Sequence, residues 1–202
     1  EPGSVDGYVI WRVQPRWSRG LADNLVRVRE LIALTPQAEG ALWRLVLDLD
    51  LAGTVQLGNR PLDEPLRWRL ADSRQLRTTR VTDGLWVRLL DLQAALAARG
   101  YAADGALVLE VADPLRPGDQ GRFRLEAGQA GATCACTDAD PDLVLDVAAL
   151  GAVWLGGMRL ASLARAGRVR QARPGALARA DAMFACHPAP WSTTIEVSIA
   201  KP

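Results

Sequence analysis

Lysine, histidine and long apolar runs are scarce in this sequence of 202 residues. Lys201 is the only lysine among 24 basic residues, and His187 is the only histidine. The net charge is +1 and the arginines form no single block, which argues against a nucleic-acid partner because such a surface needs a basic stripe. There is no run of about 18 apolar residues and no secretory signal, so we expect a cytoplasmic protein without a membrane partner.

Motifs for metals, phosphates and nucleophiles are also missing. The three cysteines are an odd number, and Cys134-Ala-Cys136 lacks the spacing of a zinc site or a redox pair. Residues 137–142 (TDADPD) lack the glycine and the glutamate of a calcium loop, so we expect a solvated turn there. Gly156-Gly157 is too short for a phosphate loop and predicts a tight turn between helices. The sequence therefore predicts neither a metal site nor a cofactor site in this chain.

The first half contains both strand and helix patterns. A helix is expected after Thr35-Pro36, because threonine is a good N-cap and proline suits the first helical position. Asp83-Gly84 separates two alternating stretches and predicts a hairpin or a junction of strands. The alternation of apolar and polar residues predicts strands, and apolar residues one helical turn apart predict a second, short helix. The expected strands cover residues 7–13, 25–34, 55–57, 76–82 and 85–90, and the short helix covers residues 65–71.

The second half changes from strands to helices. Asp91 is expected to cap a helix that ends before Gly100. Four strands are then expected, followed by three helices, which together predict an α+β fold in two units with a boundary near residues 82–85. The strands cover residues 106–111, 122–126, 133–137 and 143–147, and the helices cover 148–154, 158–166 and 174–184.

Tryptophan is unusually common, with seven residues of this type. Most of them lie on or beside apolar elements, and we expect these to pack in the core. Trp191 differs because it follows the proline-rich segment 188–190, which makes it a candidate for the wall of a pocket. His187 could act as a general base, but no matched partner is visible, so an exposed loop histidine is the favoured interpretation.

Many collinear stretches of the sequence resemble the C-terminal half of the Eis family (enhanced intracellular survival), multi-domain GNAT N-acetyltransferases. They run in family order and cover most of the chain. They include GYVIWRV, LIALTPQAEGALWRLVLDLDLAGTV, DGLWVRLLDLQAALAARGYAADGALVLEVADP and PDLVLDVAALGAVWLGG, at residues 7–13, 31–55, 83–114 and 141–157. Further matches are RPLDEPLRWRLAD, GRFRLEAG and LARAGRVRQARPGALARADAMF, at residues 60–72, 121–128 and 163–184.

The resemblance implies a partial GNAT-like mixed sheet over residues 1–82 and a sterol-carrier-protein-like α/β domain over residues 83–202. The family binds acetyl-CoA in a first GNAT domain, which would precede Glu1, so this chain would be part of a larger enzyme and inactive alone. The resemblance further implies an amine substrate, such as an aminoglycoside or polyamine, and a homo-oligomeric full protein.

The family also implies candidate site residues. In this family the terminal carboxylate acts as a general base on the amine, which would assign that role to Pro202 here. Trp191, Trp86 and Asp91 are the candidate substrate-binding residues, since an aromatic and acidic pocket suits a cationic amine. The sequence departs from the family pattern because residues 196–202 extend past the position at which the family usually ends.

Two other functions are weighed against this one. Sterol-carrier-type domains bind lipids in an apolar tunnel, and the strands and helices after residue 83 could line one. The small residues Ala164, Ala166, Ala178 and Ala180 instead indicate close helix packing, which argues against a tunnel. A purely structural interaction protein would expose an apolar patch where a partner docks.

Overall fold

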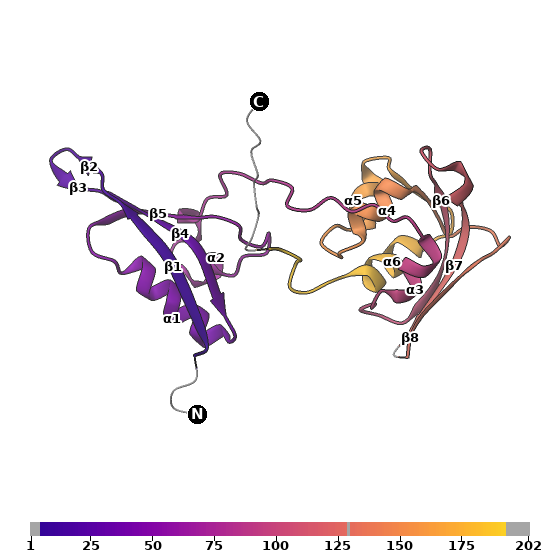
Figure 1. Cartoon of the computed structure of the whole chain (residues 1–202), viewed down its shortest axis with the longest axis horizontal. Helices are drawn as coiled ribbons and strands as arrows, with labels where there is room; N and C mark the ends of the chain where they lie inside the picture. Colours follow the sequence, from indigo (N-terminus) through magenta and orange to yellow (C-terminus); the bar gives the residue numbers. More distant parts are fainter. Residues whose placement is uncertain (1–4, 129, 193–202) are drawn as a thin grey trace. The chain divides into compact units, whose positions relative to one another are not determined.

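The computed structural model describes residues 5–128 and 130–192, and the chain divides into two compact units. Of these residues, unit 1 comprises 5–84 and 191–192, and unit 2 comprises 85–128 and 130–190. Both units combine a sheet with helices (Figure 1), so the expected α+β class is confirmed.

Unit 1 is built on a three-stranded sheet in the order β1-β4-β5. Strands β1 (Gly7–Gln14) and β4 (Asn24–Ala33) are antiparallel, whereas β4 and β5 (Ala52–Leu57) are parallel. A parallel pair needs a crossover, and helix α1 (Pro36–Leu47) supplies it. The remaining short elements are β2 (Trp17–Ser18), β3 (Leu21–Ala22), α2 (Leu66–Arg69) and the 3₁₀ turn η1 (Ser73–Gln75).

Helix α1 begins as the sequence predicts and covers one face of this sheet. The Thr35 hydroxyl accepts a hydrogen bond from the Ala38 N–H at 3.1 Å, and Pro36 is the first helical residue. Trp43 and Val46 are the buried residues of the helix, and they share a core with Val26 of β4. The core of unit 1 is therefore formed between α1 and the inner face of the sheet.

Unit 2 contains a five-stranded sheet in the order β10-β9-β6-β7-β8. Only the β6–β9 pair is parallel. The four helices gather on one side of this sheet (Figure 1). Its elements are α3 (Leu92–Ala98), β6 (Gly105–Ala112), η2 (Pro117–Asp119), β7 (Gly121–Gly128), β8 (Gly131–Cys136), β9 (Leu143–Asp146), α4 (Val147–Val153), α5 (Leu160–Arg165), β10 (Val169–Gln171) and α6 (Ala176–Phe184).

The interior of unit 2 is filled by large aliphatic side chains from the sheet and the helices. Leu107 and Leu109 of β6 pack with Leu125 of β7, Leu96 of α3 and Met183 of α6, and all five are almost completely buried. Ala180 is buried among them, while Ala166 and Ala178 are exposed. Two of the four alanines used to predict close helix packing therefore do not contribute to it, but the leucines fill the space.

The hairpin predicted at Asp83-Gly84 is wrong, because residues 76–89 form neither helix nor strand. Residues of this stretch contact other parts of unit 2 and do not pair with a strand. The Val87 carbonyl lies against Gly151 of α4, and the Arg88 guanidinium binds Asp113 after β6. A residue with strand propensity forms a strand only where a neighbouring strand can pair with it, and Val87 lies against helix α4 instead.

Most tryptophans are not in the core, contrary to expectation. Trp43 is completely buried and Trp154 is half-buried against the core of unit 2. Trp68 on α2 is 83% exposed and Trp86 is 85% exposed. Trp68 lies on a one-turn helix and Trp86 on an extended stretch, and both side chains face mainly solvent.

Gly156 forms the predicted tight turn between α4 and α5, and we expect its replacement by alanine to destabilise unit 2 by about 3 kcal/mol. Its φ is +84°, and an added Cβ would lie 2.6 Å from both the Cys186 Cβ and the Phe184 carbonyl oxygen. Gly167 has a similar φ of +74° with open space around it. Gly167→Ala is thus the matched control for backbone strain alone, and should cost only about 1 kcal/mol in urea unfolding. Equal losses for the two variants would show that the contacts at Gly156 do not matter.

The ion pair between Arg88 and Asp113 makes the stability of unit 2 depend on pH. Arg88 Nη2 donates to both carboxylate oxygens at 2.8 and 2.7 Å, and the Leu115 and Arg116 N–H groups donate to Oδ1. The hydrogen bond from Arg88 is the main reason that the pKa of Asp113 is lowered, with the two backbone donors adding to it against the opposing effect of burial. A lowered pKa stabilises the fold above the ordinary carboxyl pKa near 4, and that stabilisation is lost as the pH falls below it.

We therefore expect Arg88→Met to lower the free energy of unfolding at pH 6 and to have a smaller effect at pH 3, because the stabilisation declines as the pH falls through the lowered pKa of Asp113. Urea unfolding of the wild type and the variant at both pH values measures this difference. A deficit of the same size at pH 3 and pH 6 would contradict the role of the ionised Asp113.

Candidate functional site

The best-defined polar cluster of unit 1 centres on Arg60, in the loop between β5 and α2. Its side chain is only 12% exposed. Nη1 donates to the Leu31 carbonyl at 2.9 Å, Nε donates to Glu64, and Nη2 donates to Glu39 of α1 at 3.3 Å. A buried guanidinium needs this degree of pairing, and two carboxylates with one carbonyl provide it.

Two indole rings contact the same guanidinium. The Arg60 Cζ lies 5.5 Å from the centroid of the buried Trp43 ring and 4.9 Å from that of Trp191. Both distances are within the range of a cation–π interaction. Trp191 is thereby held on unit 1 through Arg60, and 37% of its surface stays exposed. An aromatic ring that is fixed in place and still exposed can contact a ligand.

The other predicted site residues lie elsewhere. Trp86 and Asp91 belong to unit 2, where Trp86 is highly exposed and Asp91 is the N-cap of α3. The Asp91 Oδ1 accepts a hydrogen bond from the Ala94 N–H at 2.9 Å, as a cap should. Pro202 lies outside the described residues. His187 is exposed in the loop after α6, which agrees with the surface interpretation.

The start of α1 offers a poor site for the pyrophosphate of acetyl-CoA. A helix N-terminus attracts anions through its free N–H groups. Here the Ala38 N–H donates to the Thr35 hydroxyl, the Glu39 N–H donates to the Thr35 carbonyl, and Pro36 has no N–H. The Glu39 carboxylate also lies in the first turn and would repel a phosphate. These residues do not fit the pyrophosphate of the cofactor.

The sequence pattern predicts a site role for Trp191, which stays a prediction, but it gives no such indication for Arg60. No local pattern distinguishes Arg60 from the other arginines, because its partners come from distant parts of the chain. A weak signal exists in the charge balance, since Glu39 and Glu64 lie beside apolar residues that the pattern predicts to be buried. Buried carboxylates need a cation, and this requirement alone could have pointed to an internal arginine.

Two family models match successive parts of the chain. A family model described as "Acetyltransferase (GNAT) domain" matches residues 1–89, and one described as "Sterol carrier protein domain" matches residues 92–193. The second of these covers half of the chain. The second part of the chain therefore belongs to the sterol carrier protein domain family, and most of the chain is similar to Eis-like GNAT N-acetyltransferases.

Several relatives show how much of such proteins this chain represents. It is 44% identical over 189 residues to an uncharacterised N-acetyltransferase of Streptomyces coelicolor, covering 94% of this chain and 46% of the relative. It is 41% identical to the N-acetyltransferase Eis of Mycobacterium tuberculosis, covering 89% of this chain and 42% of that protein. The crystal structure of Eis1 from Mycobacterium abscessus aligns with a TM-score of 0.80 and 38% identity, covering 93% of this chain and 48% of that one. The chain spans less than half the length of each.

Among the described residues, no helix combines the length and the apolar character that a membrane crossing requires.

Proposed function

We propose that this chain supplies the scaffold and part of the substrate pocket of an acetyl-CoA-dependent amine N-acetyltransferase. The observation that carries the proposal is the fixed position of Trp191 over Arg60 on the GNAT-type unit. A ring that is fixed but exposed can contact a cationic amine at little entropic cost. Arg60 is in this proposal a positioning residue for Trp191.

The acceptor amine is proposed to be an aminoglycoside or a polyamine. Trp86 and Asp91 are kept as predictions of substrate contact within unit 2, and Pro202 as the prediction for the terminal carboxylate that acts as general base. Asp91 keeps one carboxylate oxygen free of its capping bond, since only Oδ1 accepts from Ala94. That oxygen could receive a hydrogen bond from an ammonium group.

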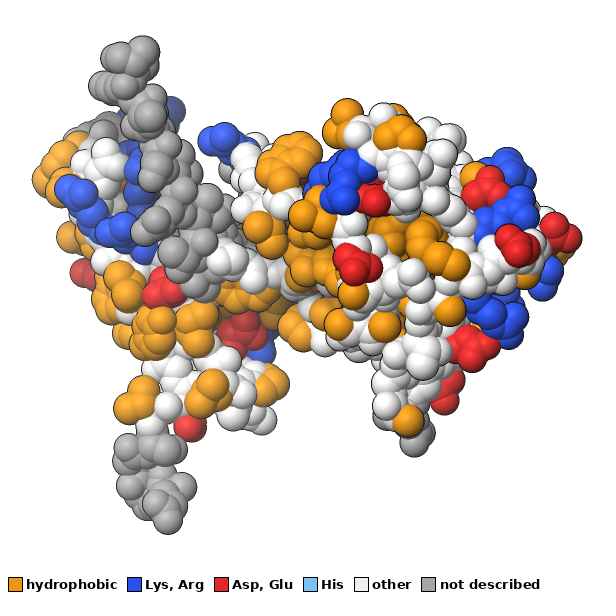
Figure 2. Space-filling view, turned by 45° about the vertical axis from the view of Figure 1, so that its right-hand side comes forward, with side chains coloured by type: hydrophobic (Ala, Val, Ile, Leu, Met, Phe, Trp, Pro, Cys, Tyr) orange, Lys and Arg blue, Asp and Glu red, His pale blue; other side chains and the backbone are white. Residues whose placement is uncertain are grey.

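The exposed apolar side chains of unit 1 support the view that a further polypeptide covers it. Figure 2 shows extensive hydrophobic areas on one face of the molecule. In unit 1, Trp17, Leu34, Leu62 and Trp68 are each at least 75% exposed. Exposed residues of this size and number are typical of a surface that is buried in a larger assembly. The catalytic domain and other copies of the full protein are the proposed partners.

The lipid-binding alternative rests on the family of the second domain. The dense packing of leucines between the helices and the sheet of unit 2 argues against a large apolar tunnel. Titration of the chain with a fluorescent fatty acid separates the two proposals. Saturable binding with a dissociation constant below about 1 mM, which corresponds to a binding free energy of roughly −4 kcal/mol, would favour the lipid-carrier proposal.

An acetyl-transfer assay on the chain alone tests the other part of the proposal. We expect no turnover of acetyl-CoA with kanamycin or spermine, because the start of α1 does not fit the cofactor. Measurable turnover by the isolated chain would contradict the proposed division of labour within the larger enzyme.

A further inference from the structure

A second polar cluster lies in unit 2, around Asp142, at the start of β9. Its side chain is 6% exposed. Oδ2 accepts a hydrogen bond from the Val108 N–H at 2.8 Å, and the Asp142 N–H donates to the Val108 carbonyl at 2.8 Å. The Asp142 carbonyl in turn accepts from the N–H groups of Ala172 and Arg173. Four backbone hydrogen bonds therefore fix the position of this carboxylate between β6 and the loop after β10.

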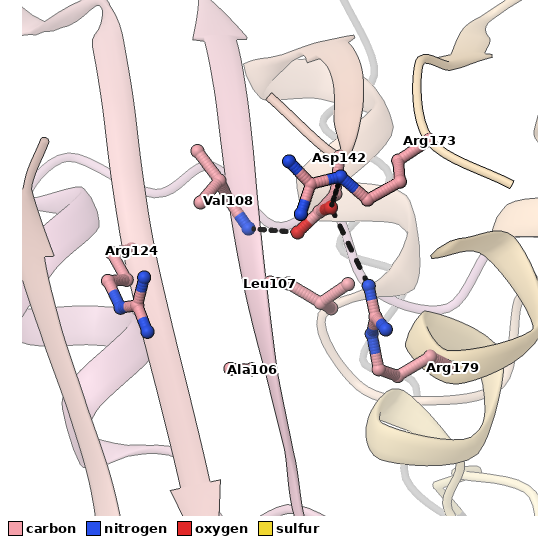
Figure 3. A pocket seen from close by; sticks show the side chains of 7 residues that line it. All are labelled: Ala106, Leu107, Val108, Arg124, Asp142, Arg173 and Arg179. Carbon is pink, nitrogen blue, oxygen red and sulfur yellow. Dashed lines mark hydrogen bonds and ion pairs between the residues drawn. The ribbon is translucent and has the colours of Figure 1, made fainter. Parts of the chain in front are cut away.

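Two arginines share the remaining oxygen of this carboxylate. Arg173 Nε lies 3.2 Å and Arg179 Nη2 lies 3.6 Å from Asp142 Oδ1 (Figure 3). Arg179 comes from α6, and Arg173 from the loop that precedes it. One negative charge is thus divided between two positive ones, which leaves a net positive charge at this place.

Each of these guanidinium groups has N–H donors that are not used by Asp142. Among the residues that the structure describes, Arg173 Nη1 and Nη2 and Arg179 Nε and Nη1 have no acceptor. A guanidinium carries five N–H donors in a planar fork. The buried carboxylate forms an ion pair with one nitrogen of each guanidinium, without a hydrogen bond to Oδ1, and leaves the other nitrogens available.

The spare donors adjoin a cavity of about 230 Å³ that opens between β6, β7 and α6. Arg124 of β7 lines the same cavity, although its Nε is paired with Glu126 at 2.7 Å. The remaining lining comes from Ala106, Leu107 and Val108 of β6. The cavity therefore has an apolar floor and a rim in which positive charge exceeds negative charge.

From this arrangement we infer that the cavity beside Asp142 binds a phosphate group. Guanidinium forks match the oxygen spacing of phosphate and bind it through two parallel hydrogen bonds. The buried Asp142 orients Arg173 and Arg179, so that less side-chain entropy is lost when the anion binds. The phosphate can be free inorganic phosphate or a group carried by a small molecule. This site lies wholly in unit 2 and is independent of the acetyl-transfer proposal.

Calorimetric titration of the full chain tests the inference with two probes, inorganic phosphate and glycerol phosphate. We expect saturable binding of at least one probe at low ionic strength, weakened at least tenfold by Arg173→Met and by Arg179→Met. Tighter binding of glycerol phosphate would identify a phosphorylated small molecule as the ligand class, and equal or weaker binding would identify the free ion. Arg165→Met removes an exposed arginine of α5 as a matched control and should leave the binding unchanged.

Two results would overturn the inference: no saturable binding of either probe, or the same affinity in the wild type and both variants. Arg173 is 61% exposed, so its replacement is the variant that perturbs folding less. If Arg179→Met does not fold, the comparison between Arg173→Met and Arg165→Met decides the outcome.

Discussion

Replacing Arg60 by methionine is expected to lower the free energy of unfolding of unit 1 by about 3–5 kcal/mol, because it leaves buried carboxylates without their cation. Glu64 is 10% exposed and would lose its ion pair, whereas Glu39 would keep only its 3.4 Å contact with Arg69. The variant also removes the guanidinium that lies against both Trp43 and Trp191. A loss of this size is a large fraction of the stability of a small unit.

Hydrogen exchange measured by mass spectrometry can assign this loss to unit 1. Protection should fall in β4 and α1, which Arg60 joins through Leu31 and Glu39, and should not change in unit 2. Arg60→Lys keeps the charge but not the planar fork, so it should recover only part of the stability. Arg74→Met is the control, because its pair with Asp72 is highly exposed and is worth less than about 1 kcal/mol. An Arg60→Met variant as stable as this control would contradict the structural role of the cluster.

The second large effect is expected for Arg99→Met in unit 2, again about 3–5 kcal/mol. Arg99 donates to three carbonyl oxygens, those of Trp154 at 2.9 Å, Phe184 at 2.6 Å and Gly100 at 2.7 Å. Trp154 and Phe184 stand at the C-terminal ends of α4 and α6, where the helix dipole favours a positive charge. The guanidinium also lies 4.8 Å from the centroid of the Tyr101 ring and 4.7 Å from that of Phe184.

Burial lowers the pKa of Arg99, while an arginine remains charged throughout the ordinary pH range. The three hydrogen bonds are therefore charge-assisted at any pH at which the protein is studied. Urea unfolding of Arg99→Met, compared with Arg165→Met on the surface of α5, measures their combined effect. A difference below about 1 kcal/mol between the two variants would show that water replaces the lost donor without cost.

The fold class and most elements could be predicted because their causes are local. Thr35 and Asp91 cap helices where the sequence placed them, and each accepts the backbone N–H three residues on. The two-residue strands β2 and β3 and the short β10 escaped prediction because two or three residues carry no period. The stretch of residues 76–89 failed for a different reason. Its alternation is that of a strand, but the choice between strand and extended coil depends on whether a partner strand lies beside it.

The candidate site could be predicted only in part. Trp191 is distinguished by its proline-rich surroundings, which are a local signal. In the Arg60 cluster, Arg60 contacts Trp191, which lies 131 positions later in the sequence. Such a contact depends on the tertiary fold and leaves no local sequence pattern. Asp142 shows the same limit, because TDADPD was expected to be a solvated turn. Asp138 and Asp140 are indeed exposed. Asp142 is buried, and its carboxylate accepts a hydrogen bond from the Val108 N–H.

The central claim is that this chain contributes a substrate-pocket wall, Trp191, to a larger amine acetyltransferase. A chimera tests it most directly, in which this chain replaces its matching region of the Mycobacterium tuberculosis N-acetyltransferase Eis. We predict that the folded chimera transfers acetyl groups from acetyl-CoA to kanamycin or spermine. Trp191→Ala should lower kcat/KM about tenfold, equivalent to about 1.4 kcal/mol, whereas Trp17→Ala on the exposed strand β2 should not. A folded chimera without acetyl transfer, or one that Trp191→Ala leaves unchanged, would contradict the claim.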